Sequence, residues 1–154
     1  MFANGRLAIR LPALALAALL CSGCPEGITI DIPIARAIRV DVINATNFDV
    51  APNIIYDRST GFLARLFPSE RLATGLLAPG ETLSFTFDCD RLGVILSDEA
   101  EQLTFGTTFV APATSPIERD REFGCRDTVE FLFIGDGIDF GVIVSVNGRI
   151  VTSS

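Results

Sequence analysis

The sequence contains no lysine, no histidine and no tryptophan. Without lysine and histidine, the chain cannot form a Schiff base, use an imidazole base or metal ligand, or hold a phosphate with a P-loop lysine. Its serines have neither a Gly-x-Ser-x-Gly setting nor a histidine to activate them, so nothing supports nucleophilic hydrolysis. We therefore expect a protein that is not an enzyme and that carries no cofactor.

The length and composition favour one folded domain. The chain has 154 residues, which is room for a single ordinary domain. Hydrophobic residues make up 49% of it and the mean hydropathy is +0.44, values that exclude a disordered acidic chain.

The first residues have the pattern of an export signal. Arg6 and Arg10 are the only charges up to Gly23, and residues 11–20 are all apolar or proline. As a helix this run would span about 15 Å, which is half of the roughly 30 Å hydrocarbon core and too short for a transmembrane anchor. The pattern predicts a cleaved signal peptide over residues 1–23. A buried N-terminal helix is the alternative, and it would bury neither flank.

The end of this segment resembles the lipobox of bacterial lipoproteins. Ser22 and Gly23 are the small residues that precede the cysteine, here Cys24, while Cys21 stands where an aliphatic residue is usual. The resemblance implies that Cys24 becomes the lipidated mature N-terminus, attached to the outer membrane because Pro25 rather than Asp follows it. Simple cleavage after Gly23, giving a periplasmic or secreted protein without lipid, is the alternative.

Two further regions follow the signal: a tether over residues 24–35 and a domain over residues 36–154. From Pro25 to Ala35 the tether would reach at most about 36 Å. The mature chain keeps 10 arginines against 19 acids, a net charge of −9. That sign argues against nucleic acid as a partner and against electrostatic attachment to anionic lipid.

Cys89 and Cys125 are the cysteines that remain in the mature domain. In an oxidising compartment they allow one intramolecular pairing, so we expect a disulfide. Two lone cysteines without histidine cannot complete a tetrahedral zinc site, and a redox pair would need closer spacing.

Apolar residues alternate with polar ones along most of the domain, which is typical of half-buried strands. Strands are expected at 37–44, 48–56, 72–77, 83–87, 92–96, 103–110, 128–134, 138–146 and 149–151, with one short helix over 62–67. Pro79-Gly80 predicts a type II turn and Asn147-Gly148 a tight hairpin, while residues 111–124 form a polar loop. About eight strands with so little helix predict an all-β fold, an antiparallel β-sandwich or small barrel. Residues 77–85 (Leu-Ala-Pro-Gly-Glu-Thr-Leu-Ser-Phe) also resemble the turn-strand entry common in immunoglobulin-like extracytoplasmic domains.

Several groups of acids offer candidate ligands, among which Asp136 and Asp139 are candidates for calcium. Their Gly-Asp-Gly-Ile-Asp setting is too short to supply six to eight oxygens by itself, so solvated turn acids are the simpler interpretation and no metal is expected. The charged run 119–122 is either a wet surface loop or a contact with a partner through arginine.

These observations predict an extracytoplasmic, lipid-anchored, non-catalytic binding or structural module of the bacterial cell envelope. Its partners would be the membrane, through the N-terminal lipid, and an envelope protein or polysaccharide. The alternative is a calcium-dependent carbohydrate-binding domain or a small hydrolase that uses the acidic turns.

Overall fold

The computed structural model describes residues 36–104, 106–136 and 138–154. The predicted signal peptide, Cys24 and the tether lie outside the described residues. Of the helices in the described part, none is both long and apolar enough to cross a membrane.

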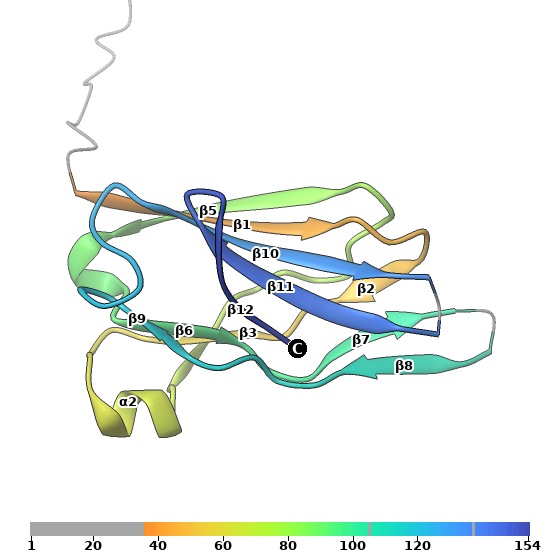
Figure 1. Ribbon diagram of the computed structural model, residues 1–154, viewed down its shortest axis with the longest axis horizontal. Helices are drawn as coiled ribbons and strands as arrows, with labels where there is room; N and C mark the ends of the chain where they lie inside the picture. Colours follow the sequence, from red (N-terminus) through yellow and green to blue (C-terminus); the bar gives the residue numbers. More distant parts are fainter. Residues whose placement is uncertain (1–35, 105, 137) are drawn as a thin grey trace, which may run out of the picture. The chain divides into compact units, whose positions relative to one another are not determined.

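One layer of the fold is a five-stranded sheet in the order β12-β11-β10-β1-β5 (Figure 1). Its strands are β1 (Ala37–Asn44), β5 (Thr82–Asp88), β10 (Thr128–Gly135), β11 (Phe140–Val146) and β12 (Arg149–Ser153). The alternation in β1 buries Ile38, Val40 and Val42 on one face, as a half-buried strand requires. β1 pairs with β10 in parallel, whereas the other neighbours in this sheet are antiparallel.

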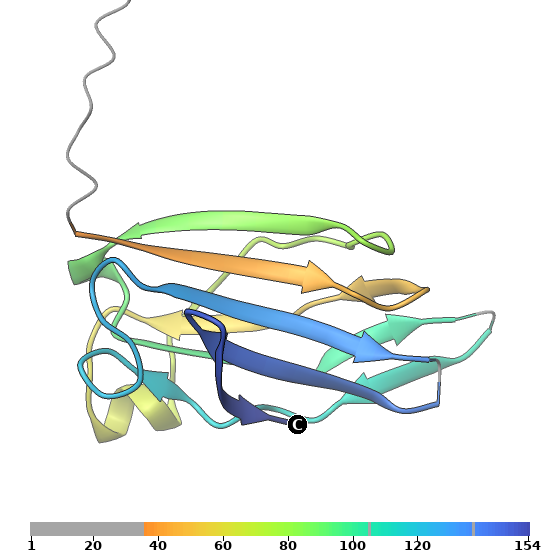
Figure 2. The same ribbon diagram turned by 45° about the horizontal axis from the view of Figure 1, so that its top comes forward.

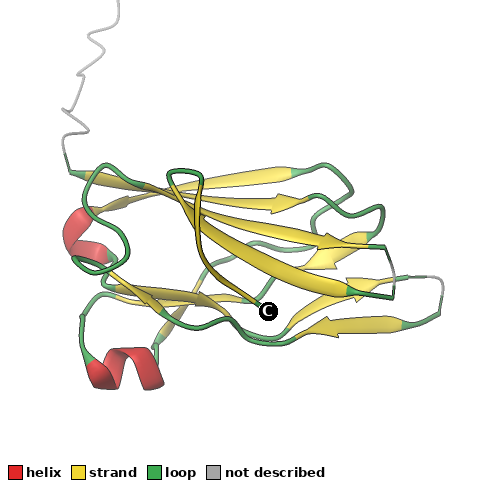
Figure 3. Ribbon diagram, viewed as in Figure 1, coloured by secondary structure: helices red, strands yellow, loops and turns green. Residues whose placement is uncertain are grey.

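The opposite layer consists of two smaller sheets (Figure 2). One has the order β2-β7-β8, from β2 (Asp49–Ala51), β7 (Ala100–Leu103) and β8 (Thr108–Ala111). The other has the order β4-β3-β6-β9, from β4 (Glu70–Arg71), β3 (Ile54–Asp57), β6 (Val94–Ser97) and β9 (Ile117–Glu118). A short helix α2 (Phe62–Leu66) and a 3₁₀ turn η1 (Cys89–Arg91) complete the described elements (Figure 3).

The core fills the space between the layers. Phe131 and Phe133 of β10 are fully buried, as are Val50, Ile54 and Ile95 from the opposite layer. Since apolar faces of two layers pack on each other with few helical residues, the predicted all-β sandwich is confirmed.

The strand directions give the sandwich two distinct ends. The entry end holds Arg36, η1 and α2, and it is where β1 and β10 begin and β5 ends (Figure 1). The far end holds the β10–β11 and β7–β8 turns.

Both predicted tight turns are present. Asn147 and Gly148 have φ values of 50° and 76°, and Val146 pairs with Arg149 across them. Gly80 has a φ of 75° behind Pro79, and the Glu81 N–H donates to the Ala78 carbonyl at 3.0 Å. These positive angles explain why each turn uses glycine or asparagine.

One predicted strand is absent, and another, over 103–110, is broken: beyond Leu103, the end of β7, it is a strand only from Thr108 on. Residues 72–77 form only an isolated bridge between Leu77 and Val50, because Gly75 takes a φ of 64° and interrupts the extended backbone. The centre of 103–110 is a turn, in which the Thr104 N–H donates to the Thr107 carbonyl at 3.0 Å and Gly106 has a φ of 85°. In both segments a left-handed glycine decides the local structure against the apolar pattern.

Candidate functional site

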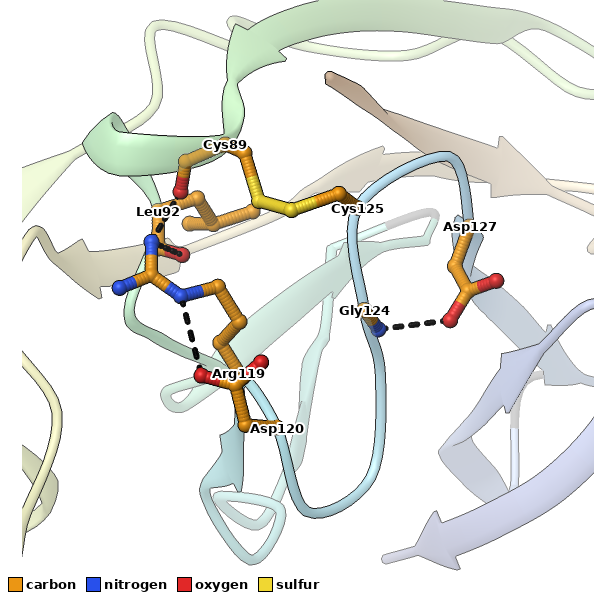
Figure 4. The surroundings of a disulfide bond; sticks show 7 residues. All are labelled: Cys89, Leu92, Arg119, Asp120, Gly124, Cys125 and Asp127. Atoms are coloured by element: carbon orange, nitrogen blue, oxygen red, sulfur yellow. Dashed lines mark hydrogen bonds and ion pairs between the residues drawn. A yellow bond between two sulfur atoms is a disulfide. The ribbon is translucent and has the colours of Figure 1, made fainter. Parts of the chain in front are cut away.

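The predicted disulfide is present and lies at the entry end. Cys89 in η1 bonds to Cys125, with 5.4 Å between the two Cα atoms and 36 residues of sequence separation. The Cys89 N–H also donates to the Arg36 carbonyl at 2.7 Å. The bond therefore fixes the end of β5 to the loop before β10, next to the point where the preceding chain enters the fold (Figure 4).

Arg119 supports the same region from the opposite layer. Its guanidinium donates to the carbonyls of Cys89 and Leu92, and its side chain is only 19% exposed (Figure 4). Of the charged run 119–122, Asp120 is the most exposed, at 80% for its side chain. Arg119 is thus held against the body of the domain and is not a free contact for a partner, whereas Asp120 and Arg121 are exposed.

A buried carboxylate connects this run to α2. Glu118 of β9 accepts a hydrogen bond from the Gly61 N–H, directly before α2. Its other oxygen lies 3.5 Å from the Arg121 guanidinium and 3.9 Å from that of Arg65. Residues 111–124 were predicted as one polar loop. They include the short strand β9 and the buried side chains of Thr114, Ile117 and Glu118, so the segment is only partly a loop.

Four ionisable groups near α2 have shifted pKa values. Hydrogen bonds from Ser59 and Ser69 lower the pKa of Asp57 to about 2. Hydrogen bonds from Arg58 and Tyr56 lower the pKa of Glu70, and the Glu70 contact raises the pKa of Arg58.

Burial and the 2.7 Å bond to Glu70 raise the pKa of Tyr56. None of these four shifts moves a group towards neutral pH, where a general acid or base works best. The cluster ties β3 to β4, and we assign it a structural role.

The candidate binding site is an open hollow of about 590 Å³ at the far end, called here the far-end hollow. Its apolar wall comes from β8 and from the β10–β11 hairpin: Phe109, Val110, Ile134, Ile138 and Phe140. Asp136, Asp139 and Ser154 add polar groups to the rim. An apolar hollow with a few polar groups is the usual form of a site for a small group or an extended segment.

The structure brings Asp136 and Asp139, the two candidate calcium ligands, to this rim. One oxygen of Asp136 already accepts hydrogen bonds from the backbone N–H groups of Ile138 (3.1 Å) and Asp139 (3.4 Å). In the part of the chain that the structure describes, no three acidic, cysteine or histidine side chains gather in a way that could hold a metal ion. Asp136 thus stabilises the turn, and Asp139 lies with it on the rim of the hollow.

Sequence reasoning missed a polar row on the outer face of the five-stranded sheet. Asp41 and Glu130 are register partners on β1 and β10, with Ser84 and Ser145 beside them. The Ser84 hydroxyl donates to Asp41 and the Ser145 hydroxyl to Glu130, each at 2.6 Å. Alternation places each of these residues opposite the apolar face of its own strand, but only the parallel pairing of β1 with β10 places the two carboxylates side by side.

Comparison with known proteins gives no family. No family model matches the chain, and no curated protein does. A solved structure described as "Trapped Toxin" is similar with a TM-score of 0.47 and 6% identity, over 71% of this chain. The match spans 23% of that structure's own chain.

Proposed function

We propose that this protein is a lipid-anchored, non-catalytic binding module of the bacterial cell envelope. The observation that carries the proposal is the position of the far-end hollow: β8 and the β10–β11 hairpin, which form its wall, lie at the opposite end of the sandwich from the start of β1 (Figure 1). A lipid on Cys24 would hold the molecule by the chain that enters at Arg36. The hollow would then face away from the membrane, towards other envelope components.

The composition of the far-end hollow indicates what it would bind. Its apolar wall suits an aliphatic or aromatic group, and the carboxylates Asp136 and Asp139 suit a neighbouring cation or hydroxyl. An envelope protein that offers an apolar side chain beside a basic one fits these features best. A polysaccharide would find no tryptophan to stack on.

Replacing Cys24 with serine tests the anchor. We expect the Cys24→Ser protein to move from the membrane fraction to the soluble fraction and to remain folded, because the thiol that carries the lipid is gone. The matched control is Cys21→Ser, which should stay with the membranes since Cys21 leaves with the signal peptide. If the Cys24→Ser protein still fractionates with membranes, the lipid anchor is wrong.

Capture from envelope extract tests the far-end hollow. The mature chain should retain an envelope component, and Ile138→Arg should reduce that retention at least about tenfold by placing a charge on the apolar wall. Ile150→Arg is the control, because Ile150 is also exposed but does not line the hollow. A chelator should leave retention unchanged, whereas loss of retention on calcium removal would favour the calcium-dependent carbohydrate-binding alternative.

A further inference from the structure

Helix α2 exposes an unusual concentration of large apolar side chains. Phe62, Leu63, Leu66 and Phe67 are 74%, 71%, 52% and 74% exposed, and they are called here the apolar tip. Of the five helical residues only Ala64 is buried. A helix that turns its small residue inward and its large ones outward gains nothing for the core of its own domain.

A chain of hydrogen bonds joins the apolar tip to the place where β1 begins. The Arg36 carbonyl accepts a hydrogen bond from the Cys89 N–H, and the Cys89 carbonyl accepts one from the Arg119 guanidinium. Next to Arg119, the Glu118 carboxylate accepts a hydrogen bond from the Gly61 N–H, directly before α2. The disulfide between Cys89 and Cys125 also holds η1, which carries Cys89, in place. The apolar tip and Arg36 therefore belong to one end of the sandwich, and Figures 1 and 2 show α2 and the start of β1 at that end.

The charges along the sandwich distinguish this end from the other. No arginine occurs in the segments that build the far end, residues 43–53, 77–82, 98–111 and 132–142. Their charged residues are all acidic: Asp49, Glu81, Asp98, Glu99, Glu101, Asp136 and Asp139. At the entry end, arginines such as Arg58 and Arg121 lie beside acids and offset them. An anionic membrane surface would repel the acidic far end more strongly than the entry end, where arginines offset the acids.

The size of the apolar tip argues against a second copy of the chain as its cover. Its four side chains expose roughly 500 Å², less than the roughly 800 Å² that each partner buries in a standard interface. The hollow of about 540 Å³ beside the helix is lined by the charged Arg65, Glu118 and Arg121 as well as by Phe62 and Leu66, so it does not offer an apolar peptide a continuous apolar groove. Apolar side chains that project in this way suit insertion below lipid headgroups.

We propose that the apolar tip inserts into the surface of a lipid bilayer and orients the domain on the membrane, with the far-end hollow outward. The inference deepens the proposed function and rests on it for the choice of membrane. The thirteen residues from Cys24 to Arg36 could separate a lipidated Cys24 from the fold by about 40 Å at most, which leaves the tip within reach of the same leaflet.

The absence of tryptophan allows a direct test. In the mature chain, residues 24–154 with Cys24→Ser, a Phe62→Trp substitution introduces the sole tryptophan. We expect its fluorescence to shift to the blue, and to be quenched by brominated lipid, on addition of phosphatidylcholine vesicles containing a minor fraction of phosphatidylglycerol. Ile138→Trp is the matched control, since Ile138 is 79% exposed at the far end and should show neither change.

A partitioning measurement completes the test. Replacing Phe62 and Phe67 together with serine should lower vesicle binding at least about tenfold with the unfolding midpoint unchanged, and added salt should weaken binding little. An unshifted Phe62→Trp spectrum, or equal shifts for both tryptophan variants, would overturn the proposal. A shift without vesicles that grows with protein concentration would also overturn it, in favour of a second copy. Because this chain carries no lipid, each result is independent of whether Cys24 is lipidated in cells.

Discussion

Removing the Cys89–Cys125 disulfide is expected to lower the free energy of unfolding by about 4 kcal/mol. The bond closes a loop of 36 residues, and without it the unfolded chain regains the conformational entropy that the loop removes. A loss of this size is a large part of the 5–15 kcal/mol that typically stabilises a domain. Urea denaturation of the double variant Cys89→Ser/Cys125→Ser, followed by circular dichroism, measures it.

The reduced wild-type protein is the control for this experiment, and it should match the double variant. Local contacts that do not use the sulfur atoms, such as the hydrogen bond from Arg119 to the Cys89 carbonyl, remain available in both. A loss below about 1 kcal/mol would contradict the entropic argument and indicate that the contacts around η1 close the loop without the bond.

Replacing Gln102 with leucine is expected to raise the free energy of unfolding by about 2 kcal/mol. Gln102 of β7 is 0% exposed, and among the described residues neither its side-chain oxygen nor its nitrogen has a hydrogen-bond partner. Its register partners are Val50 and Phe109, so the carboxamide lies in apolar surroundings. Leucine has a similar volume, removes both unpaired polar atoms and adds apolar contact. Thermal and urea unfolding measure the change.

Thr114→Val is the matched control, because Thr114 is also buried but has its hydrogen bonds. Its hydroxyl accepts from the Ser97 N–H at 3.1 Å, so the nearly isosteric valine should cost about 1–2 kcal/mol instead of adding stability. If the free energy of unfolding rises for Gln102→Leu and falls for Thr114→Val, the effect of a buried polar side chain on stability depends on whether it has hydrogen-bond partners and not on burial alone. A destabilised Gln102→Leu protein would contradict the prediction.

The local features of the fold could be predicted from the sequence. Alternation over 37–44 and 128–134 predicted two strands of the five-stranded sheet, because burying one face of a strand requires apolar residues at every second position. Pro79-Gly80 and Asn147-Gly148 predicted turns, since their residue types permit the positive φ values found there. The disulfide followed from having two cysteines in the mature domain. The export signal and the lipidation of Cys24 remain predictions that rest on the sequence.

Only the tertiary structure decided which distant segments meet. The parallel pairing of β1 with β10 joins residues such as Asp41 and Glu130, and no local pattern specifies a partner so far along the chain. The contact of Arg119 also depends on distant segments. The charged run 119–122 suggested an exposed side chain, but the Arg119 guanidinium donates to the Cys89 carbonyl in η1. The far-end hollow and the apolar tip likewise depend on which faces the other strands leave uncovered. Periodicity and turn preference are properties of a few neighbouring residues, whereas pairing and burial depend on contacts between segments that the sequence separates widely.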